Sequence, residues 1–325
     1  MATIYEVALR AGVSAATVSR VMNGIKVSPK KSEAVLAAAS ELSFTPSRTA
    51  RSLRKQNSEV VALIIPDIEN PFFTAVARGV EDRLRDAGLS LVLCNTDDDP
   101  VTEAKYFDIA MSENMAGMIL VPASDRTDLS ALIARQRPVV VVDRETSFAV
   151  DAVRMENREA GAAATMALFD AGYLRVGCIA GPVGVDTAEK RALGWREAVH
   201  ERSSADLDGY LRHGDYRVNG GRSAMAQLLA MDTPPDAVIV SNNLMGVGAL
   251  QVLSEAGLAP PAFGVAVVGD LPFTTLDPAS VTIVHLPARQ VGLTAATMLV
   301  ERIDGDIQPP RTVILRNELA PAATA

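Results

Sequence analysis

The first 45 residues contain three short stretches in which apolar residues recur at helical spacing. In the first stretch they fall at i, i+3 and i+4, at Ile4, Val7 and Ala8. Thr3 stands where a helix cap is expected, and Glu6 three residues later completes the pattern of a capping box. Gly12 then breaks the helix. The pattern predicts a short amphipathic helix followed by a tight turn.

Two more helices are predicted by similar signals. Ser14 is placed to cap the second helix, and Asn23-Gly24 to end it. Its buried stripe is predicted to consist of Val18, Val21 and Met22. Ser28 and Pro29 open the third helix as a cap and a proline at the first helical position. Its inward positions are predicted to be Val35, Leu36, Ala39 and Leu42.

Three helices in so short a segment are typical of a helix-turn-helix domain, with a generic three-helix bundle as the alternative. Ala8 is small where two helices must cross closely, and Gly12 stands where the tight turn needs a positive φ. The second helix presents polar side chains suited to phosphate and guanine, namely Thr17, Ser19 and Arg20. At its start, Ala15 and Ala16 can only contact thymine methyl groups or permit close approach. These features favour a DNA-reading domain.

A basic segment, residues 46–58, follows the third helix. A helix can start in it only after Pro46, and up to Lys55 its apolar residues are Ala50 and Leu53. Such a helix is predicted to be marginal in isolation.

From residue 59 the pattern changes to short β-branched runs that alternate with helical stretches. The first series has strands at Val60–Ile65, Leu91–Asn95, Met118–Val121 and Val139–Val142, and helices near Phe73–Ala87, Val101–Asn114 and Leu129–Ala134. The second series has strands at Val176–Ala180, Leu211–His213, Ala237–Val240, Val265–Val268 and Thr282–Leu286, and helices near Glu159–Ala171, Asp186–His200, Gly220–Ala230 and Met245–Ala256. This alternation predicts parallel sheets, so the expected fold is an α/β body of two doubly wound lobes behind an all-α helix-turn-helix domain.

The residues just after each predicted strand are the ones most informative about function. Ligands of open parallel sheets bind outside the carboxyl ends of the strands, and two facing lobes form a cleft there. These positions carry Asn70-Pro71-Phe72-Phe73, Asp143-Arg144, Thr187, Arg191, Asp215-Tyr216, Asn242-Asn243 and Asp270. Arg, Asp and Asn beside aromatic rings suit a polyhydroxylated or heterocyclic ligand.

Charge is divided unevenly along the chain. Residues 1–58 carry a net charge of +6 and the remainder −14, which suggests a basic head that meets a polyanion on an acidic body. The longest apolar runs are far shorter than the roughly 20 residues that a membrane-spanning helix needs. The amino terminus lacks the basic flank and apolar core of a secretory signal. We expect a cytoplasmic protein with no membrane partner.

Enzyme motifs are missing from the sequence. It has no Gly-x-Ser-x-Gly elbow, no Gly-Lys-Ser/Thr phosphate loop and no His-Glu-x-x-His pair. The three histidines, His200, His213 and His285, lie far apart in the sequence. Cys94 and Cys178 lie 84 positions apart in apolar runs, typical of buried reduced thiols rather than of a disulfide or a metal pair. We expect no catalytic residue, cofactor or metal.

The segments TIYEVALRAGVSAATVSRVMNG and VSPKKSEAVLAAASELSFTPSRTARSL resemble the DNA-binding head and hinge of LacI-family transcriptional regulators. The resemblance implies that the major groove is read from Ala15, Ala16 and Arg20. It also implies a hinge helix that orders on the operator, with Leu53 wedged between base pairs in the minor groove; the alternative is a linker leucine packed on the body. Ser47 replaces the family's common Asn and can still cap a helix. The implied DNA-binding residues are Thr3, Ser14, Ala15, Ala16, Thr17, Ser19, Arg20, Asn23, Arg48, Ala50 and Leu53.

The strand-end residues resemble the family's periplasmic-binding-protein-like (type I) effector domain, to about residue 317. The resemblance implies an effector cleft lined by Phe72, Phe73, Asp143, Arg191, Tyr216, Asn242 and Asp270. The alternatives are a surface salt bridge for Arg191 and a place in the core for Phe73. Asn243 stands where the family usually has Asp, and the loop that carries Asp270 is about two residues shorter than usual. The ligand therefore cannot be carried over from any relative, although the resemblance suggests a pentose, hexose or nucleoside.

The function expected from these observations is sequence-specific transcriptional regulation, by a repressor whose operator affinity a sugar or nucleoside-like effector controls. Because one helix-turn-helix reads only a half-site, we expect a homodimer on a palindromic operator. The expected domains are 1–45 helix-turn-helix, 46–58 hinge and 59–325 body, with lobe one at about 59–157 and 288–309 and lobe two at about 158–287 and 310–325. The rival hypothesis is a cytosolic sugar-binding or sugar-modifying protein whose basic head binds DNA nonspecifically.

Overall fold

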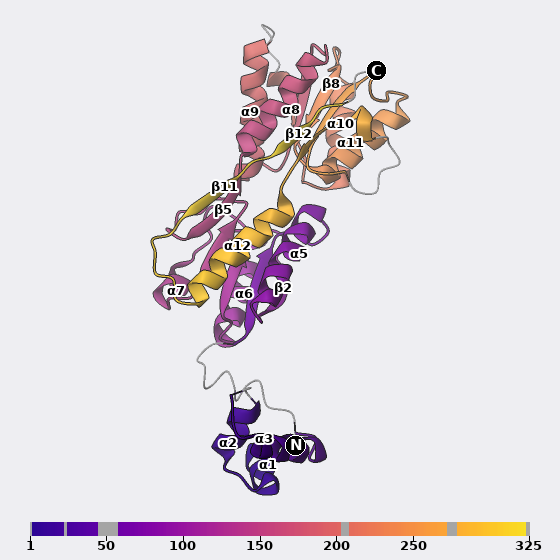
Figure 1. Cartoon of the computed structure of the whole chain (residues 1–325). Helices are drawn as coiled ribbons and strands as arrows, with labels where there is room; N and C mark the ends of the chain where they lie inside the picture. The colour runs from indigo at the N-terminus through magenta and orange to yellow at the C-terminus, as the bar shows by residue number, and fades with distance from the viewer. Residues whose placement is uncertain (1, 23–24, 45–57, 203–207, 272–277, 323–325) are drawn as a thin grey trace. The chain divides into compact units, whose positions relative to one another are not determined.

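The computed structural model describes residues 2–22, 25–44, 58–202, 208–271 and 278–322. The chain falls into two compact units, residues 1–58 and residues 59–325 (Figure 1). The described part of the first unit, the head, is helical, and the second unit, the body, is built from α/β elements. Within the described residues, no helix is both long and apolar enough to span a bilayer.

The head has three short helices around a small apolar core: α1 (Ile4–Ala11), α2 (Ala15–Met22) and α3 (Pro29–Glu41). Each helix places one fully buried valine in this core, Val7, Val18 and Val35 respectively. The predicted capping box is present, because Thr3 Oγ1 accepts a hydrogen bond from the Glu6 N–H and the Glu6 carboxylate accepts one from the Thr3 N–H. Gly12 follows α1 with φ 63°, so the expected left-handed turn is confirmed.

Two details of the third helix differ from the prediction. Ser28 precedes α3, but its side chain makes no capping hydrogen bond. By contrast Ser14 caps α2, where its Oγ accepts from the N–H three residues later at 3.2 Å. Leu36 was predicted to face inward and is 54% exposed, and Ala38 is buried in its place. Successive helix residues point about 100° apart, so a helix that buries Val35 turns Leu36 towards solvent.

Lobe one of the body is a parallel six-stranded sheet in the order β11-β5-β4-β3-β1-β2. Its strands are β1 (Val60–Ile65), β2 (Ser90–Asn95), β3 (Gly117–Leu120), β4 (Val139–Val142), β5 (Asp151–Met155) and β11 (Thr312–Leu315). Its helices are α5 (Pro71–Asp86), α6 (Pro100–Ser112), α7 (Ser130–Ala134) and α12 (Ala288–Ile303). Alternate residues of β1 belong to two separate apolar clusters, one with α5 and α12 and one with α6 and α7. The sheet is therefore covered on both faces.

Lobe two is a second six-stranded sheet, in the order β12-β10-β9-β8-β6-β7, in which β12 pairs antiparallel with β10. Its strands are β6 (Val176–Ala180), β7 (Leu211–His213), β8 (Ala237–Val240), β9 (Gly264–Val268), β10 (Thr282–His285) and β12 (Glu318–Ala320). Its helices are α8 (Asn157–Asp170), α9 (Asp186–Arg202), α10 (Val218–Leu229) and α11 (Asn243–Glu255), with short 3-10 turns at Asp208–Tyr210 and Pro278–Ser280. The doubly wound architecture expected from the alternating pattern is confirmed.

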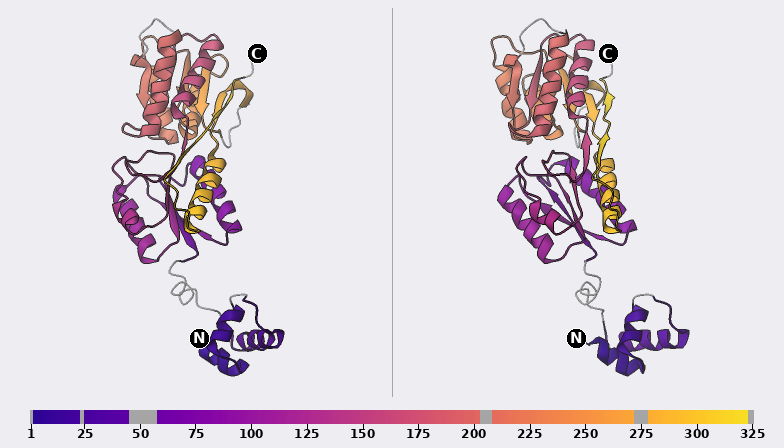
Figure 2. Two further views of the ribbon diagram at one scale, coloured as in Figure 1. Left: turned by 60° about the vertical axis from the view of Figure 1, so that its left-hand side comes forward. Right: turned by 90° about the vertical axis from the view of Figure 1, so that its left-hand side faces the viewer.

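The chain crosses between the lobes three times: between β5 and α8, between β10 and α12, and between β11 and β12 (Figure 2). The prediction assigned residues 310–325 to lobe two. This is wrong for β11, which pairs with β5 in the sheet of lobe one. The sequence pattern also did not predict β5, α12, β11 or β12. The strands β11 and β12 are short, and none of their residues is fully buried, so they lack the continuous apolar run of a central strand.

Pairs of helices in the body cross at glycines, which bring the two backbones into contact. Between α8 and α9, a Cβ added to Gly194 would lie 1.9 Å from the carbonyl oxygen of Arg158. A Cβ added to Gly161 would lie 2.0 Å from the carbonyl oxygen of Arg191. The same reciprocal approach occurs between α5 and α12 and between α10 and α11. Side chains larger than a hydrogen atom would force these helices apart.

We expect Gly194→Ala to lower the free energy of unfolding by about 1–3 kcal/mol, because the added methyl group overpacks a contact between two backbones. Chemical denaturation followed by circular dichroism measures the change. The control is Gly209→Ala, since a Cβ at Gly209 meets nothing within 4 Å. Alanine is a better helix former than glycine by about 1 kcal/mol, so a stabilised Gly194→Ala variant would show that the helices separate at little cost.

Candidate functional site

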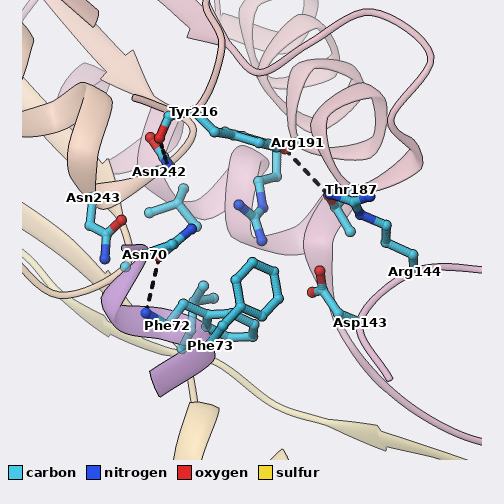
Figure 3. Close-up of a pocket in the computed structure, with 13 residues that line it drawn as sticks. Asn70, Phe72, Phe73, Asp143, Arg144, Thr187, Arg191, Tyr216, Asn242 and Asn243 are labelled. Atoms are coloured by element: carbon cyan, nitrogen blue, oxygen red, sulfur yellow. Dashed lines mark hydrogen bonds between the residues drawn. The ribbon is translucent and has the colours of Figure 1, made fainter. Parts of the chain in front are cut away.

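A cavity lies between the two lobes of the body (Figure 3). Lobe one supplies residues from the start of α5 and the turn after β4: Asn70, Phe72, Phe73, Asp143 and Arg144. The remaining lining residues are Thr187, Arg191, Tyr216, Asn242, Asn243, Val268, Gly269 and Leu286. They all follow the carboxyl ends of strands, where doubly wound sheets bind ligands. The mixed lining, with polar side chains beside aromatic rings, is typical of a small-molecule site.

Six of the seven predicted effector residues line this cavity, namely Phe72, Phe73, Asp143, Arg191, Tyr216 and Asn242. Asp270 does not line it, because its side chain is 68% exposed and pairs with Nδ1 of His285. Four further lining residues stand at the strand ends that the sequence pattern singles out: Asn70, Arg144, Thr187 and Asn243. Their position after a predicted strand was enough to mark them as candidates for the cavity lining. Val268, Gly269 and Leu286 are lining residues without a chemical signal in the sequence.

Arg191 projects from α9 into the cavity and is only 5% exposed (Figure 3). Its Nε donates to Asn157 Oδ1 at 2.8 Å, and its Nη1 donates to the carbonyl oxygen of Ser241 at 2.6 Å. A buried guanidinium with these partners is not a surface salt bridge. The side chain is fixed by neutral acceptors, so its charge stays available to a ligand.

Asp143 and Arg144 form one wall of the cavity from the turn after β4. Both are buried, and within the described residues Asp143 Oδ1 and Arg144 Nε have no hydrogen-bond partner. Arg144 Nη1 donates to Asp98 and to the carbonyl oxygen of Pro122. Burial raises the pKa of the Asp143 carboxyl, and the charges of Arg191 and Arg144 oppose this shift. The turn after β4 thus holds a buried acceptor on Asp143 and a buried donor on Arg144 that have no hydrogen-bond partner among the described residues.

Two cavity residues other than glycine have a left-handed backbone, Asp143 with φ 67° and Tyr216 with φ 64°. Each such conformation costs of order 1 kcal/mol and persists where the surroundings enforce it. The Tyr216 ring lies against Gly181, where an added Cβ would come within 2.3 Å of it. Asn242 donates to the Tyr216 carbonyl oxygen at 2.8 Å and caps α11 through its Oδ1. The polar lining is thus preorganised by local contacts.

Phe72 and Phe73 form the apolar part of the lining. Their ring centroids lie 5.1 Å apart at an interplanar angle of 79°, an edge-to-face arrangement. Phe73 is buried in the lobe-one core and also lines the cavity, so it has a place in the core and its role in effector binding stays a prediction. Trp195 is fully buried in the core of lobe two and donates to the carbonyl oxygen of Val176.

Two groups of ion pairs join lobe one to lobe two. Arg217 of lobe two lies 3.4 Å from both Asp67 and Glu69 and 3.8 Å from Asp97 of lobe one. In a second group, Lys190 and Asp186 of lobe two bind Glu145 of lobe one: Lys190 Nζ donates to the Glu145 carboxylate at 2.6 Å, and the Glu145 N–H donates to Asp186 at 3.2 Å. Arg217, Glu145 and Asp186 are each next in the chain to a residue that lines the cavity. Their attraction favours the approach of the two lobes over a ligand.

Other titratable groups do not converge on a second centre. His213 bonds the carbonyl oxygen of Gly181, His285 pairs with Asp270, and His200 is exposed. Among the residues that the structure describes, there is no group of three or more His, Cys, Asp or Glu that could hold a metal ion. Cys94 and Cys178 are free and buried, and burial raises the pKa of Cys178 to about 12.

In the head, α2 carries the predicted base-reading residues. Ser14, Ala16 and Arg20 are exposed, whereas Ala15 is half-buried against the apolar core of the head. Thr17 and Ser19 are half-buried; the Oγ1 of Thr17 is hydrogen-bonded to the Oγ of Ser14 at 3.0 Å. Thr3 is exposed and engaged in the capping box. Asn23, Arg48, Ala50 and Leu53 lie outside the described residues.

Two family profiles match the chain. The profile described as bacterial regulatory proteins of the lacI family matches residues 3–47, and the periplasmic binding proteins and sugar binding domain of the LacI family matches residues 58–321. The chain therefore belongs to the LacI family of bacterial regulators. It is a DNA-binding transcriptional regulator with an effector domain, as the sequence predicted.

Similar proteins agree with this assignment. The ribose operon repressor of Escherichia coli K12 is 34% identical over 309 residues, which cover 93% of each chain. The transcriptional repressor PurR of Photobacterium profundum is 30% identical over 98% of this chain and 97% of its own. A solved CelR–cellobiose complex is 29% identical with a TM-score of 0.73, covering 99% of this chain and 100% of that chain. The Lac repressor dimer bound to operator and anti-inducer has a TM-score of 0.88 at 23% identity and covers 100% of this chain and 99% of its own, which shows the shared fold.

Proposed function

We propose that the chain acts as a homodimer that represses transcription from a palindromic operator, and that a small neutral sugar in the cavity changes its operator affinity. The observation that carries this proposal is the cavity between the lobes, which is lined by fixed polar side chains from both. Two of its lining residues, Asp143 and Arg144, each have a buried polar atom without a hydrogen-bond partner in the described part of the chain. A ligand that both lobes contact changes the angle between them and is linked to DNA affinity. We infer no enzymatic activity, and we place the protein in the cytoplasm with its operator.

The charges around the cavity favour a neutral effector. Arg191 and Arg144 are balanced by Asp143 and Asp98, and Asn243 adds no charge. Hydroxyl groups can donate to the carboxylate of Asp143 and accept from the guanidinium of Arg144, while the Phe72 and Phe73 rings suit an apolar sugar face. The E. coli relative is named for the ribose operon, so D-ribose is the first effector to test.

The DNA-contacting roles are proposed by residue. Arg20, exposed on α2, donates to guanine in the major groove, and Ala16 approaches a thymine methyl group. Thr17 and Ser19 contact the DNA backbone. Leu53 is the wedge in the minor groove, a role that rests on the family resemblance.

The first experiment selects bound duplexes from a random DNA library at near-physiological salt, where nonspecific phosphate binding is weak. We expect a palindrome with two half-sites. Random sequence throughout the selected pool would support the rival, a sugar-binding or sugar-modifying protein with a nonspecific basic head. Repeating the selection with D-ribose shows whether effector binding releases or strengthens the complex.

A further inference from the structure

Asn157 is a buried polar residue at the border between the two lobes. It is the first residue of α8, and β5 of lobe one ends two residues earlier, at Met155. Its side chain does not line the cavity. Oδ1 accepts from Arg191 Nε at 2.8 Å, while Nδ2 donates to the carbonyl oxygen of Met155 at 3.5 Å. One side chain thus connects a cavity arginine to the last residue of a lobe-one strand.

The same border is joined to a second crossing of the chain. Asn317, between β11 and β12, donates through Nδ2 to the carbonyl oxygen of Glu156 at 2.9 Å. Arg316 lies 3.8 Å from the Glu156 carboxylate. Asn157 therefore stands where two of the three interlobe connections are bonded together. A rotation of one lobe against the other therefore moves the backbone of the connection between β5 and α8, and with it the side-chain amide of Asn157.

The geometry of Arg191 depends on this amide. A guanidinium group is planar and presents its donors in a rigid fork, so two fixed hydrogen bonds set the plane of the whole group. One bond is to the carbonyl oxygen of Ser241, after β8, and the other is to Asn157. One helical turn beyond Asn157, Gly161 allows the backbone of Arg191 to approach α8 closely. Without the bond to Asn157, the guanidinium keeps one anchor and can turn about it.

We infer that Asn157 is a positioning residue for effector recognition: it holds the guanidinium of Arg191 in its binding orientation and ties that orientation to the lobe border, without touching the effector. The part that concerns effector affinity rests on the proposed sugar-binding function. The part that concerns the orientation of Arg191 does not, and it can be measured without any ligand.

The test compares Asn157→Leu, which keeps a similar volume and removes the acceptor, with Asn157→Asp, which restores it. Gln251→Leu is the matched control, because Gln251 Oε1 accepts from Arg222 at 3.2 Å on the outside of the same lobe. The first readout is the NMR signal of the Arg191 Nε–H, assigned by its loss in Arg191→Lys. The second readout is the Kd for D-ribose by calorimetry.

We expect fast exchange of the Arg191 Nε–H with water in Asn157→Leu and slow exchange in the wild type, Asn157→Asp and Gln251→Leu. D-ribose affinity should fall by about ten-fold in Asn157→Leu and keep the wild-type value in Gln251→Leu. Slow exchange in a folded Asn157→Leu variant, or a D-ribose affinity of that variant equal to the wild-type value, would overturn the inference. If the wild type itself binds no D-ribose, the proposal that D-ribose is the effector fails. Hydrogen exchange of the Arg191 Nε–H still shows whether Asn157 positions Arg191. If Asn157→Leu does not fold, Asn157→Ser is measured in its place. The serine hydroxyl is too short to reach Arg191, so the Arg191 Nε–H should again exchange fast with water. Slow exchange in Asn157→Ser would contradict the inference.

Discussion

Arg191→Ala is expected to abolish the effector response while leaving operator binding in place. The substitution removes the buried guanidinium, and with it a charged hydrogen bond to the effector worth about 1.5–3 kcal/mol. It also leaves the buried acceptors of Asn157 and Ser241 without their donor. Fluorescence anisotropy of labelled operator, titrated with and without D-ribose, measures both quantities in one assay.

The control for this substitution is Arg158→Ala. Arg158 is an exposed arginine on the neighbouring helix α8, where it pairs with Glu197 outside the cavity. We expect this variant to keep the full response. An Arg191→Ala protein that still changes its operator affinity with D-ribose would remove Arg191 from the effector site.

Arg20→Ala is expected to lose about 1–3 kcal/mol of binding free energy on the selected operator and little on random DNA. Arg20 is exposed on α2, and among the proposed groove-reading residues of that helix it is the one that can form strong hydrogen bonds. Its neighbours at the helix start, Ala15 and Ala16, cannot replace a donor pair to guanine. Competition binding with the two kinds of duplex at a fixed salt concentration gives both free energies.

Lys30→Ala is the matched control for Arg20, because it removes the same charge from an exposed position at the start of α3. Loss of a phosphate contact weakens binding to all sequences alike and lowers the salt dependence by about one counterion. Equal loss on both duplexes in Arg20→Ala would make Arg20 a phosphate contact and not a base reader.

The central strands of both lobes were predictable because they are buried on both faces. Strands such as β4 and β6 form continuous apolar runs that have few other structural solutions. The edges of the sheets were less predictable. β11 and β12 are short and partly exposed, and their place depends on which strand they meet after a crossing. The prediction for Leu36 was wrong for another reason: Val35 and Leu36 are consecutive apolar residues about 100° apart on α3, and the packing of α3 decides which of them is buried.

Much of the candidate site followed from one rule of α/β folds, that ligands bind where parallel strands end. This rule located Asp143, Arg191 and Asn242, which line the cavity. It also selected Asp270, which the structure turns outward to His285. A strand end fixes the region in which a side chain lies but not its direction. Direction is set by the local backbone, as the left-handed φ of Asp143 illustrates.

The sequence by itself determined the helix-turn-helix head, the alternation of central strands and helices in the body, and most of the residues that meet between the lobes. These features depend on local periodicity, on caps and turns, and on the side of a sheet where strands end. Tertiary structure alone decided that β11 joins the sheet of lobe one while β12 joins that of lobe two. It also decided the ion pairs of Arg217 between the lobes and the hydrogen bond between Asn157 and Arg191. Each joins residues far apart in the chain, and no local pattern encodes such a pairing because its energy exists only once both partners are packed.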